Sequence, residues 1–203
     1  MSSTPLLRPL QPFAARAELE PFRLSAGASW QANNLSLQFR LQGPLHQLRI
    51  PQAAAEPARR DGLWQSTCFE AFVGLPGQAS YWEINLCPSG HWNLYALSGY
   101  RQNLRPEPAL EALPFRLQLE PQGEGQALLL LNLHLQVRAA GSTLNWQQAP
   151  GMEPEQPTGT TQPELELSAT AVLDHHRCGC SYWAWRHCAA DADFHRRESF
   201  LPL

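Results

Sequence analysis

Residues 63–101, LWQSTCFEAFVGLPGQASYWEINLCPSGHWNLYALSGYR, indicate the fold of this chain most clearly. Apolar and polar side chains alternate along three consecutive segments, and a period of two residues is typical of β-strands whose two faces have different surroundings. The turn Pro88-Ser89-Gly90 fits a three-residue hairpin loop, because proline presets the first turn angle and glycine tolerates the left-handed position. The stretch therefore predicts three antiparallel strands joined by two turns.

The alternation divides these strands into two faces. One face is apolar and is predicted to join the core; it contains Thr67, Phe69, Ala71, Val73, Trp82, Ile84, Leu86, Trp92, Leu94 and Ala96. The other face is rich in carboxyl, amide and phenol groups; it contains Cys68, Glu70, Phe72, Tyr81, Glu83, Asn85, His91, Asn93 and Tyr95. We interpret the second face as a ligand-binding surface, whereas a face that is merely solvated would show the same alternation.

The hairpin turns also predict which residues lie opposite one another. The Pro-Ser-Gly turn places Asn85 opposite Asn93 and Glu83 opposite Tyr95. In the first hairpin, we expect Glu70 to lie opposite Glu83. Cβ atoms in such a pair are about 5 Å apart, and two carboxylates at that distance repel each other.

The expected carboxylate pair needs a compensating interaction. A shared proton, a nearby cation such as Arg101, a bound metal cation or a ligand with several hydroxyl groups would each supply one. Aromatic side chains beside hydrogen-bonding groups suit sugar-like ligands. We therefore predict a polar patch with aromatic and arginine residues at its rim, formed by Trp64, Glu70, Glu83, Asn85, Asn93, Tyr95, Tyr100 and Arg101.

The rest of the chain shows the same β-type alternation. Further strands are predicted at residues 35–41, 115–119, 128–137, 165–173 and 181–186. The sequence thus predicts an all-β fold, an antiparallel β-sandwich, formed by one domain over residues 1–203 with a flexible insertion at about 141–163. Its expected core includes Phe69, Trp82, Ile84, Leu86, Leu94, Leu131 and Leu133.

Composition narrows the classes of function. The chain has 203 residues, a net charge of −3 and 16% charged residues, so bulk electrostatics does not favour nucleic-acid binding. No apolar run is long enough for a signal peptide or a membrane span, and we expect a soluble, cytoplasmic protein without a membrane partner.

Cysteine and histidine residues cluster near the C-terminus but lack the spacing of common structural zinc sites. We expect all five cysteines to be free thiols and no metal to be bound. If zinc were present, its predicted ligands would be Cys178, Cys180, His175 and His187.

Three segments carry a resemblance to a known family: LWQSTCFEAFVG, YWEINLCPSGHWNLYALSGYR and SYWAWRHCAADADFHRRESF. Together they resemble the DOMON-like family of small bacterial proteins, which is similar to family-9 carbohydrate-binding modules and to the DOMON domains of extracellular redox proteins. The resemblance covers the chain from about Leu35 onward, and it implies a β-sandwich that binds a sugar or a haem without an established catalytic role. The chain departs from the family at His187-Cys188, where members often have His-Pro, and in its long insertion.

We therefore expect a non-catalytic module that binds a carbohydrate or a sugar-like metabolite and needs no cofactor. A haem-binding DOMON domain is one alternative, but Met1 and Met152 are poorly placed as ligands, which leaves His134 and His91 as donors. A glycoside-processing enzyme that uses Glu70 and Glu83 is another, because retaining glycosidases place two carboxyl groups about 5 Å apart. The sequence leaves open whether the chain is an enzyme and whether it has a protein partner.

Overall fold

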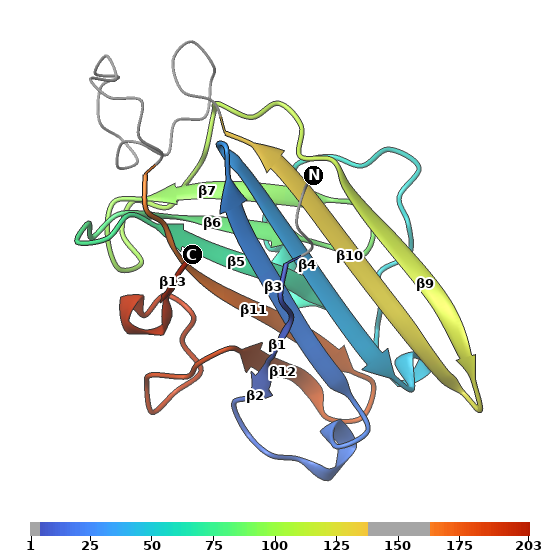
Figure 1. Ribbon diagram of the computed structural model, residues 1–203. Helices are drawn as coiled ribbons and strands as arrows, with labels where there is room; N and C mark the ends of the chain where they lie inside the picture. Colours follow the sequence, from blue (N-terminus) through green and yellow to red (C-terminus); the bar gives the residue numbers. More distant parts are fainter. Residues whose placement is uncertain (1–4, 138–162) are drawn as a thin grey trace.

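A computed structural model describes residues 5–137 and 163–203, so the insertion expected at about 141–163 lies almost entirely outside the described residues. The described strands form two antiparallel sheets (Figure 1). Sheet A has the order β1 (Arg8–Pro9), β3 (Arg23–Gln31), β4 (Asn34–Gly43), β10 (Gln126–Gln136), β9 (Phe115–Gly123). Sheet B has the order β2 (Gln11–Pro12), β12 (Gly179–Ala184), β11 (Glu166–His175), β5 (Cys68–Gly74), β6 (Tyr81–Leu86), β7 (Trp92–Leu97), β8 (Arg105–Pro106), and β13 (Leu201–Pro202) pairs with β11.

The helical segments of the described chain are four single 3-10 turns. They are η1 (Ala17–Leu19), η2 (Leu45–Gln47), η3 (Leu63–Gln65) and η4 (Arg197–Ser199). Within residues 5–137 and 163–203, no helix is long and apolar enough to cross a membrane.

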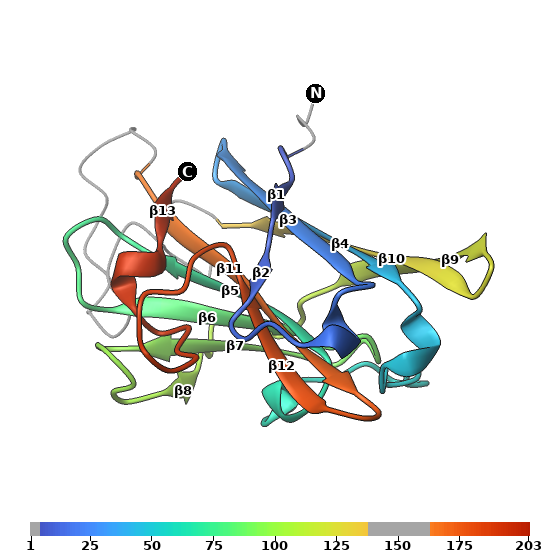
Figure 2. The same cartoon turned by 90° about the horizontal axis from the view of Figure 1, so that it is seen from below.

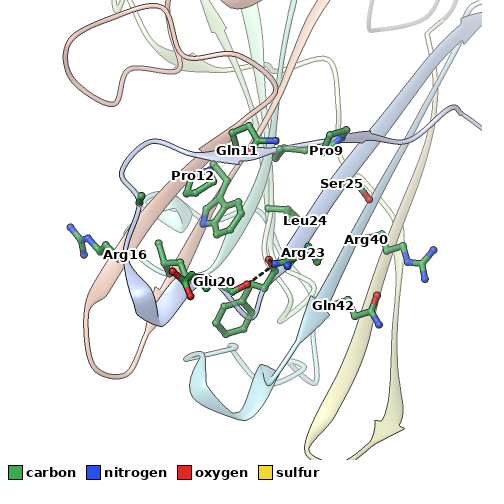
Figure 3. Close-up of a pocket in the computed structure, with 15 residues that line it drawn as sticks. Pro9, Gln11, Pro12, Arg16, Glu20, Arg23, Leu24, Ser25, Arg40 and Gln42 are labelled. Carbon is green, nitrogen blue, oxygen red and sulfur yellow. Dashed lines mark hydrogen bonds between the residues drawn. The ribbon is translucent and has the colours of Figure 1, made fainter.

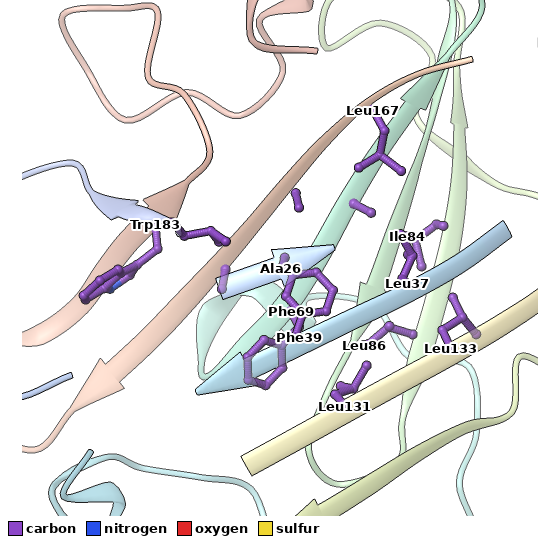
Figure 4. Close-up of a cluster of buried hydrophobic side chains, with 14 of the residues drawn as sticks. Ala26, Leu37, Phe39, Phe69, Ile84, Leu86, Leu131, Leu133, Leu167 and Trp183 are labelled. Carbon is purple, nitrogen blue, oxygen red and sulfur yellow. The ribbon is translucent and has the colours of Figure 1, made fainter. Parts of the chain in front are cut away.

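The two sheets pack face to face and enclose one apolar core, which confirms the predicted β-sandwich. Figure 2 shows the sheets as two layers, with β3 and β4 in one and β5, β6 and β7 in the other. Side chains from both sheets meet between them (Figure 4). The ring centroids of Phe39 on β4 and Phe69 on β5, for example, are 5.3 Å apart. All seven predicted core residues are buried there, and Trp82 and Trp92 face inward as expected.

All five strands predicted outside the 63–101 stretch are present, as β4, β9, β10, β11 and β12. The sequence did not predict β3, because this strand (RLSAGASWQ) carries small residues where the others carry leucine and phenylalanine. At Gly27 the small size is required: a Cβ atom would lie 2.8 Å from the Leu6 carbonyl oxygen, so the N-terminal segment packs directly on the backbone of β3.

The predicted register of the first hairpin is wrong by two residues. Glu70 lies opposite Asn85 rather than Glu83, and Phe72 lies opposite Glu83. A slip of two residues keeps every side chain on its predicted face, so alternation cannot exclude it. Glu70 and Glu83 are therefore diagonal neighbours on the same face. The second hairpin has the predicted register.

Two separate segments cover the outer face of sheet B, the face away from the core. One is the stretch of residues 58–65 that ends in η3, and the other is the C-terminal stretch of residues 192–200. Figure 2 shows the C-terminal stretch (red) folding back beside β11, which it joins through β13. Because of these two covers, the polar residues of this face are buried.

Candidate functional site

A pocket of about 340 Å³ lies on the outer face of sheet B, between strands β5, β6, β11 and β12 and the C-terminal cover. Its polar lining residues are Glu70, Glu83, Arg101 and His195. Its walls are otherwise aromatic and aliphatic, formed by Trp64, Phe72, Leu104, Val172, Tyr182, Ala192 and Phe194.

The two glutamates in the pocket floor are almost completely buried, with exposed fractions of 2% for Glu70 and 4% for Glu83. Each carboxyl group has one oxygen held by a donor from the protein. The Thr170 hydroxyl donates to Glu70 Oε2 at 3.3 Å, and the Asn85 amide nitrogen donates to Glu83 Oε1 at 2.8 Å. The remaining oxygens, Glu70 Oε1 and Glu83 Oε2, are buried without a hydrogen-bond partner.

Burial makes both carboxyl groups weaker acids than they are in water, because the charged form loses its hydration. The pKa of Glu70 is raised well above 4.5, by burial first and by repulsion from Glu83 second. Burial also raises the pKa of Glu83, although the hydrogen bond from Asn85 and the charge of Arg101 oppose the shift. The pair therefore retains a proton at a pH where an exposed carboxyl group has lost it.

His195 from the C-terminal cover completes the polar lining. Its Nδ1 lies 2.8 Å from the Tyr81 hydroxyl, and the backbone N–H of Arg101 donates to that hydroxyl at 3.2 Å. Tyr81 therefore donates its own proton to Nδ1, and neutral His195 carries its hydrogen on Nε2, 4.0 Å from Glu83 Oε2. Burial lowers the pKa of His195 to about 4, so the ring is neutral at neutral pH.

Asp193 ties the C-terminal cover to the loop that follows β7. It accepts hydrogen bonds from the Tyr100 hydroxyl at 2.6 Å and from Arg101 Nη2 at 3.0 Å, and Arg196 Nε lies 3.1 Å away. Burial opposes ionisation, but the hydrogen bonds from Tyr100 and Arg101 and the charge of Arg101 lower the pKa of Asp193. Arg101 has a left-handed backbone (φ 52°), which is unusual for a residue other than glycine. The loop is thus held in a strained conformation at the pocket rim.

The eight predicted site residues lie on one side of the sheet, but only half of them line the pocket. Trp64, Glu70, Glu83 and Arg101 do so. Asn85 is fully buried behind Glu83 and holds its carboxyl group. Tyr100 lies outside the pocket, where it binds Asp193.

Asn93 and Tyr95 hold the first cover instead of lining the pocket. Both donate hydrogen bonds to Asp61 Oδ1, at 3.0 Å and 2.7 Å. Arg59 donates to Asn93 Oδ1 at 3.0 Å. This cover carries Trp64, whose ring lies 5.9 Å from that of Tyr95. The two residues therefore position Trp64 at the pocket.

Six residues that line the pocket were not predicted from the sequence to belong to the site: Leu104, Val172, Tyr182, Ala192, Phe194 and His195. A seventh, Phe72, was placed on the correct face but not in the site. The outward alternation of β11 gave a signal for Val172, and the resemblance carried by the segment SYWAWRHCAADADFHRRESF gave one for the C-terminal cover. Neither signal tells which part of the sheet these residues approach, because their position depends on pairing between strands that are far apart in the sequence.

The predicted histidine donors for haem do not converge. His134 lies on β10 of sheet A, where its Nδ1 is 3.0 Å from the Ser36 hydroxyl. His91 lies in the β6–β7 turn of sheet B and accepts a hydrogen bond from the Ala58 N–H at 3.1 Å. The two residues belong to different sheets, and neither of them lines the candidate pocket.

The cysteines and His187, which were considered as possible metal ligands, have other surroundings in the structure. All five cysteines are free, and Cys68 packs with Leu63 and Cys87 in a small buried cluster. His187 Nε2 lies 2.9 Å from the Gln11 carbonyl oxygen. Among the residues that the structure describes, no three His, Cys, Asp or Glu side chains are grouped to hold a metal ion.

A larger groove of about 640 Å³ lies elsewhere, between the N-terminal segment and the edges of both sheets (Figure 3). Its charged residues Arg16, Glu20, Arg23 and Arg40 are exposed to solvent. None of the buried, unpartnered polar atoms found in the described part of the chain belongs to its lining. We therefore assign the candidate site to the smaller pocket, where buried polar groups lack partners.

Comparison with known proteins supports the fold assignment. No family model and no curated protein matches this chain. Among solved structures, a "putative carbohydrate-binding protein" from Bacteroides uniformis matches with a TM-score of 0.64 and 12% identity, over 98% of this chain and 85% of that chain. A family 9 carbohydrate-binding module from Caldicellulosiruptor kristjanssonii, in complex with glucose, matches with a TM-score of 0.40 and 10% identity, over 89% and 73%. The first likeness shows that this chain shares the β-sandwich fold of that protein.

Proposed function

We propose that the pocket on sheet B binds a small sugar-like molecule without chemically transforming it. The observation that carries this proposal is the pair of unpartnered oxygens, Glu70 Oε1 and Glu83 Oε2, buried in the pocket floor. A buried polar atom without a partner costs about 1–3 kcal/mol. Ligand hydroxyl groups would donate to these oxygens and remove that cost.

The walls of the pocket fit the same class of ligand. Trp64, Phe72, Tyr182 and Phe194 provide aromatic surface, which packs against the apolar faces of sugar rings. The volume of about 340 Å³ is near the lower end of the range for small-molecule pockets. This size favours a single sugar ring over a polymer. The carbohydrate-binding description of the Bacteroides uniformis protein supports the same class of ligand.

The site residues divide by role in this proposal. Glu70, Glu83, Trp64 and Arg101 would contact the ligand, since they line the pocket. Asn85 would orient Glu83, to which it donates a hydrogen bond. The pair Asn93 and Tyr95 would position Trp64 through Asp61, and Tyr100 would position Arg101 through Asp193.

Isothermal titration calorimetry against a panel of monosaccharides would test the proposal. We expect at least one monosaccharide to bind, and Glu83→Gln to weaken its binding about tenfold or more, because a hydrogen bond to a charged group is lost. Glu111→Gln is the matched control, since this glutamate is exposed and is not one of the pocket-lining residues. Equal affinity in Glu83→Gln and wild type, or no binding at all, would contradict the proposal. Release of p-nitrophenol from aryl glycosides by the wild-type protein would indicate an enzyme instead.

A further inference from the structure

Among the described residues, no arginine forms a salt bridge with either carboxyl group of the pocket floor. Two carboxyl groups, Glu70 and Glu83, lie in its floor, and the raised pKa of each reflects a buried site without a contacting cation. His195 is 4.0 Å from Glu83 but neutral at neutral pH. Arg101 lines the rim, where its guanidinium is paired with Asp193 at 3.0 Å. The described residues thus leave both carboxyl groups without a cation of their own.

Among the four buried polar side-chain atoms without a partner in the described residues, the two that belong to the pocket lining are both carboxyl oxygens, whereas Asn85 Oδ1 and Arg197 Nη1 belong to residues outside it. Glu70 Oε1 and Glu83 Oε2 are acceptors when ionised, so an ideal partner has several donors and no acceptor. A protonated primary amine has three N–H donors and a positive charge. A neutral hydroxyl group has one donor and no charge. An ammonium group therefore matches the pocket floor in both hydrogen bonding and charge.

We propose that the pocket selects ligands that carry a protonated amine, with amino sugars as the favoured class, over their neutral counterparts. This inference rests on the proposed function, which it makes more specific. The ammonium group donates to Glu70 Oε1 and Glu83 Oε2 together, while the sugar ring packs against the walls. The aromatic rings of Phe72 and Phe194 contribute further, because aromatic faces attract cations.

The geometry of the two strands suits this role. Glu70 pairs with Asn85, and Glu83 pairs with Phe72, so the two carboxyl groups are diagonal neighbours across β5 and β6. Diagonal neighbours are more widely spaced than opposed residues, with Cα atoms about 7–8 Å apart. The spacing allows one small cationic group to lie between two long side chains. Thr170 and Asn85 each hold one oxygen of a carboxyl group by a hydrogen bond, which leaves the other oxygen for the ligand.

The test uses matched pairs of ligands and the full-length wild-type chain. Calorimetry is carried out with glucosamine and glucose, galactosamine and galactose, mannosamine and mannose, and cyclohexylamine and cyclohexanol, at a pH below the pKa of each amine. We expect the best amino sugar to bind at least about tenfold more tightly than its neutral counterpart, since hydrogen bonds to charged partners are the stronger ones. Glu70→Gln and Glu83→Gln should each reduce that ratio, and Glu111→Gln should preserve it.

The outcomes separate this inference from the proposed function. A neutral sugar that binds as tightly as its amino counterpart overturns the inference and leaves the sugar-binding function standing. Preferential binding of cyclohexylamine without binding of any sugar supports an amine site and overturns the sugar-binding function. Absence of binding by every ligand overturns both. The wild-type ratios decide the matter even if a glutamine variant fails to fold, which far-ultraviolet circular dichroism would show.

Discussion

The outer faces of the two sheets share the same alternating sequence pattern, but only one of them is buried. On sheet A, Gln38 and Asn132 are half-buried and hydrogen-bonded to each other at 2.8 Å, as on an ordinary solvated sheet. On sheet B, the polar residues Glu70, Glu83 and Asn85 are all at least 96% buried, since their exposed fractions are 2%, 4% and 0%. The strands themselves do not cause this difference. It arises from the segments that cover sheet B.

The covers change the chemistry of the face they bury. They come from residues 58–65 and 192–200, which are far apart in sequence. Each is held by an aspartate: Asp61 binds Asn93 and Tyr95, and Asp193 binds the loop around Arg101. With water excluded, carboxyl groups lose hydration and their pKa values rise. Burial by distant segments thus converts a solvated sheet face into a candidate binding site.

Matched asparagine substitutions on the two faces would test this comparison, and the larger effect is expected on sheet B. Asn85→Ala removes the 2.8 Å hydrogen bond to Glu83 and leaves a cavity in a fully buried place. We expect the free energy of unfolding to fall by about 2 kcal/mol, because a hydrogen bond to a charged group and buried volume are both lost. Urea denaturation followed by tryptophan fluorescence would measure it. A loss below about 0.5 kcal/mol would show that the outer face of sheet B is not more constrained than a solvated face.

The pH dependence of stability should report the buried carboxyl groups. The pKa values of Glu70 and Glu83 are raised above 4.5 in the folded protein, so the folded state holds protons that the unfolded chain releases. Their contribution to stability therefore falls as the pH rises from about 4.5 through the folded pKa values. The slope is at most about 1.4 kcal/mol per pH unit for each group.

His195 changes the stability in the opposite direction over part of this pH range. Its pKa is about 4 in the folded protein against an ordinary value of 6.5, so the unfolded chain binds the extra proton between these values and stability rises with pH there. Above about pH 6.5 this contribution is constant and no longer offsets the loss of stability due to the carboxyl groups. Glu70→Gln should make the decline shallower, as measured by urea denaturation at a series of pH values. If stability depended on pH in the same way in Glu70→Gln, in the control Glu111→Gln and in wild type, the raised pKa of Glu70 would be contradicted.

The sequence predicts the sandwich well because burial of one strand face requires alternation, which can be read from neighbouring residues. Phe69, Trp82 and Leu131 were assigned to the core on that basis, and all are buried there. The candidate site is only partly predictable. Alternation places Glu70 and Glu83 on the same face, but it cannot fix a register that differs by two residues.

The rest of the site depends on contacts between distant parts of the chain. His195 reaches Tyr81 across 114 positions, and Thr170 reaches Glu70 across 100. No local pattern contains this information. The same limitation explains why the burial of the polar face could not be distinguished from solvation in the sequence.

The smallest effect is expected on the outer face of sheet A. Asn132→Ala removes the 2.8 Å hydrogen bond from Gln38, but both side chains are partly exposed and water can replace the lost partner. We expect the free energy of unfolding to change by no more than about 0.5 kcal/mol, as for most surface substitutions. The change deletes the same chemical group as Asn85→Ala, from the other face, so the two unfolding curves can be compared directly. If Asn132→Ala were as destabilising as Asn85→Ala, the two outer faces would be energetically equivalent, and burial by the covers would not account for the special chemistry of sheet B.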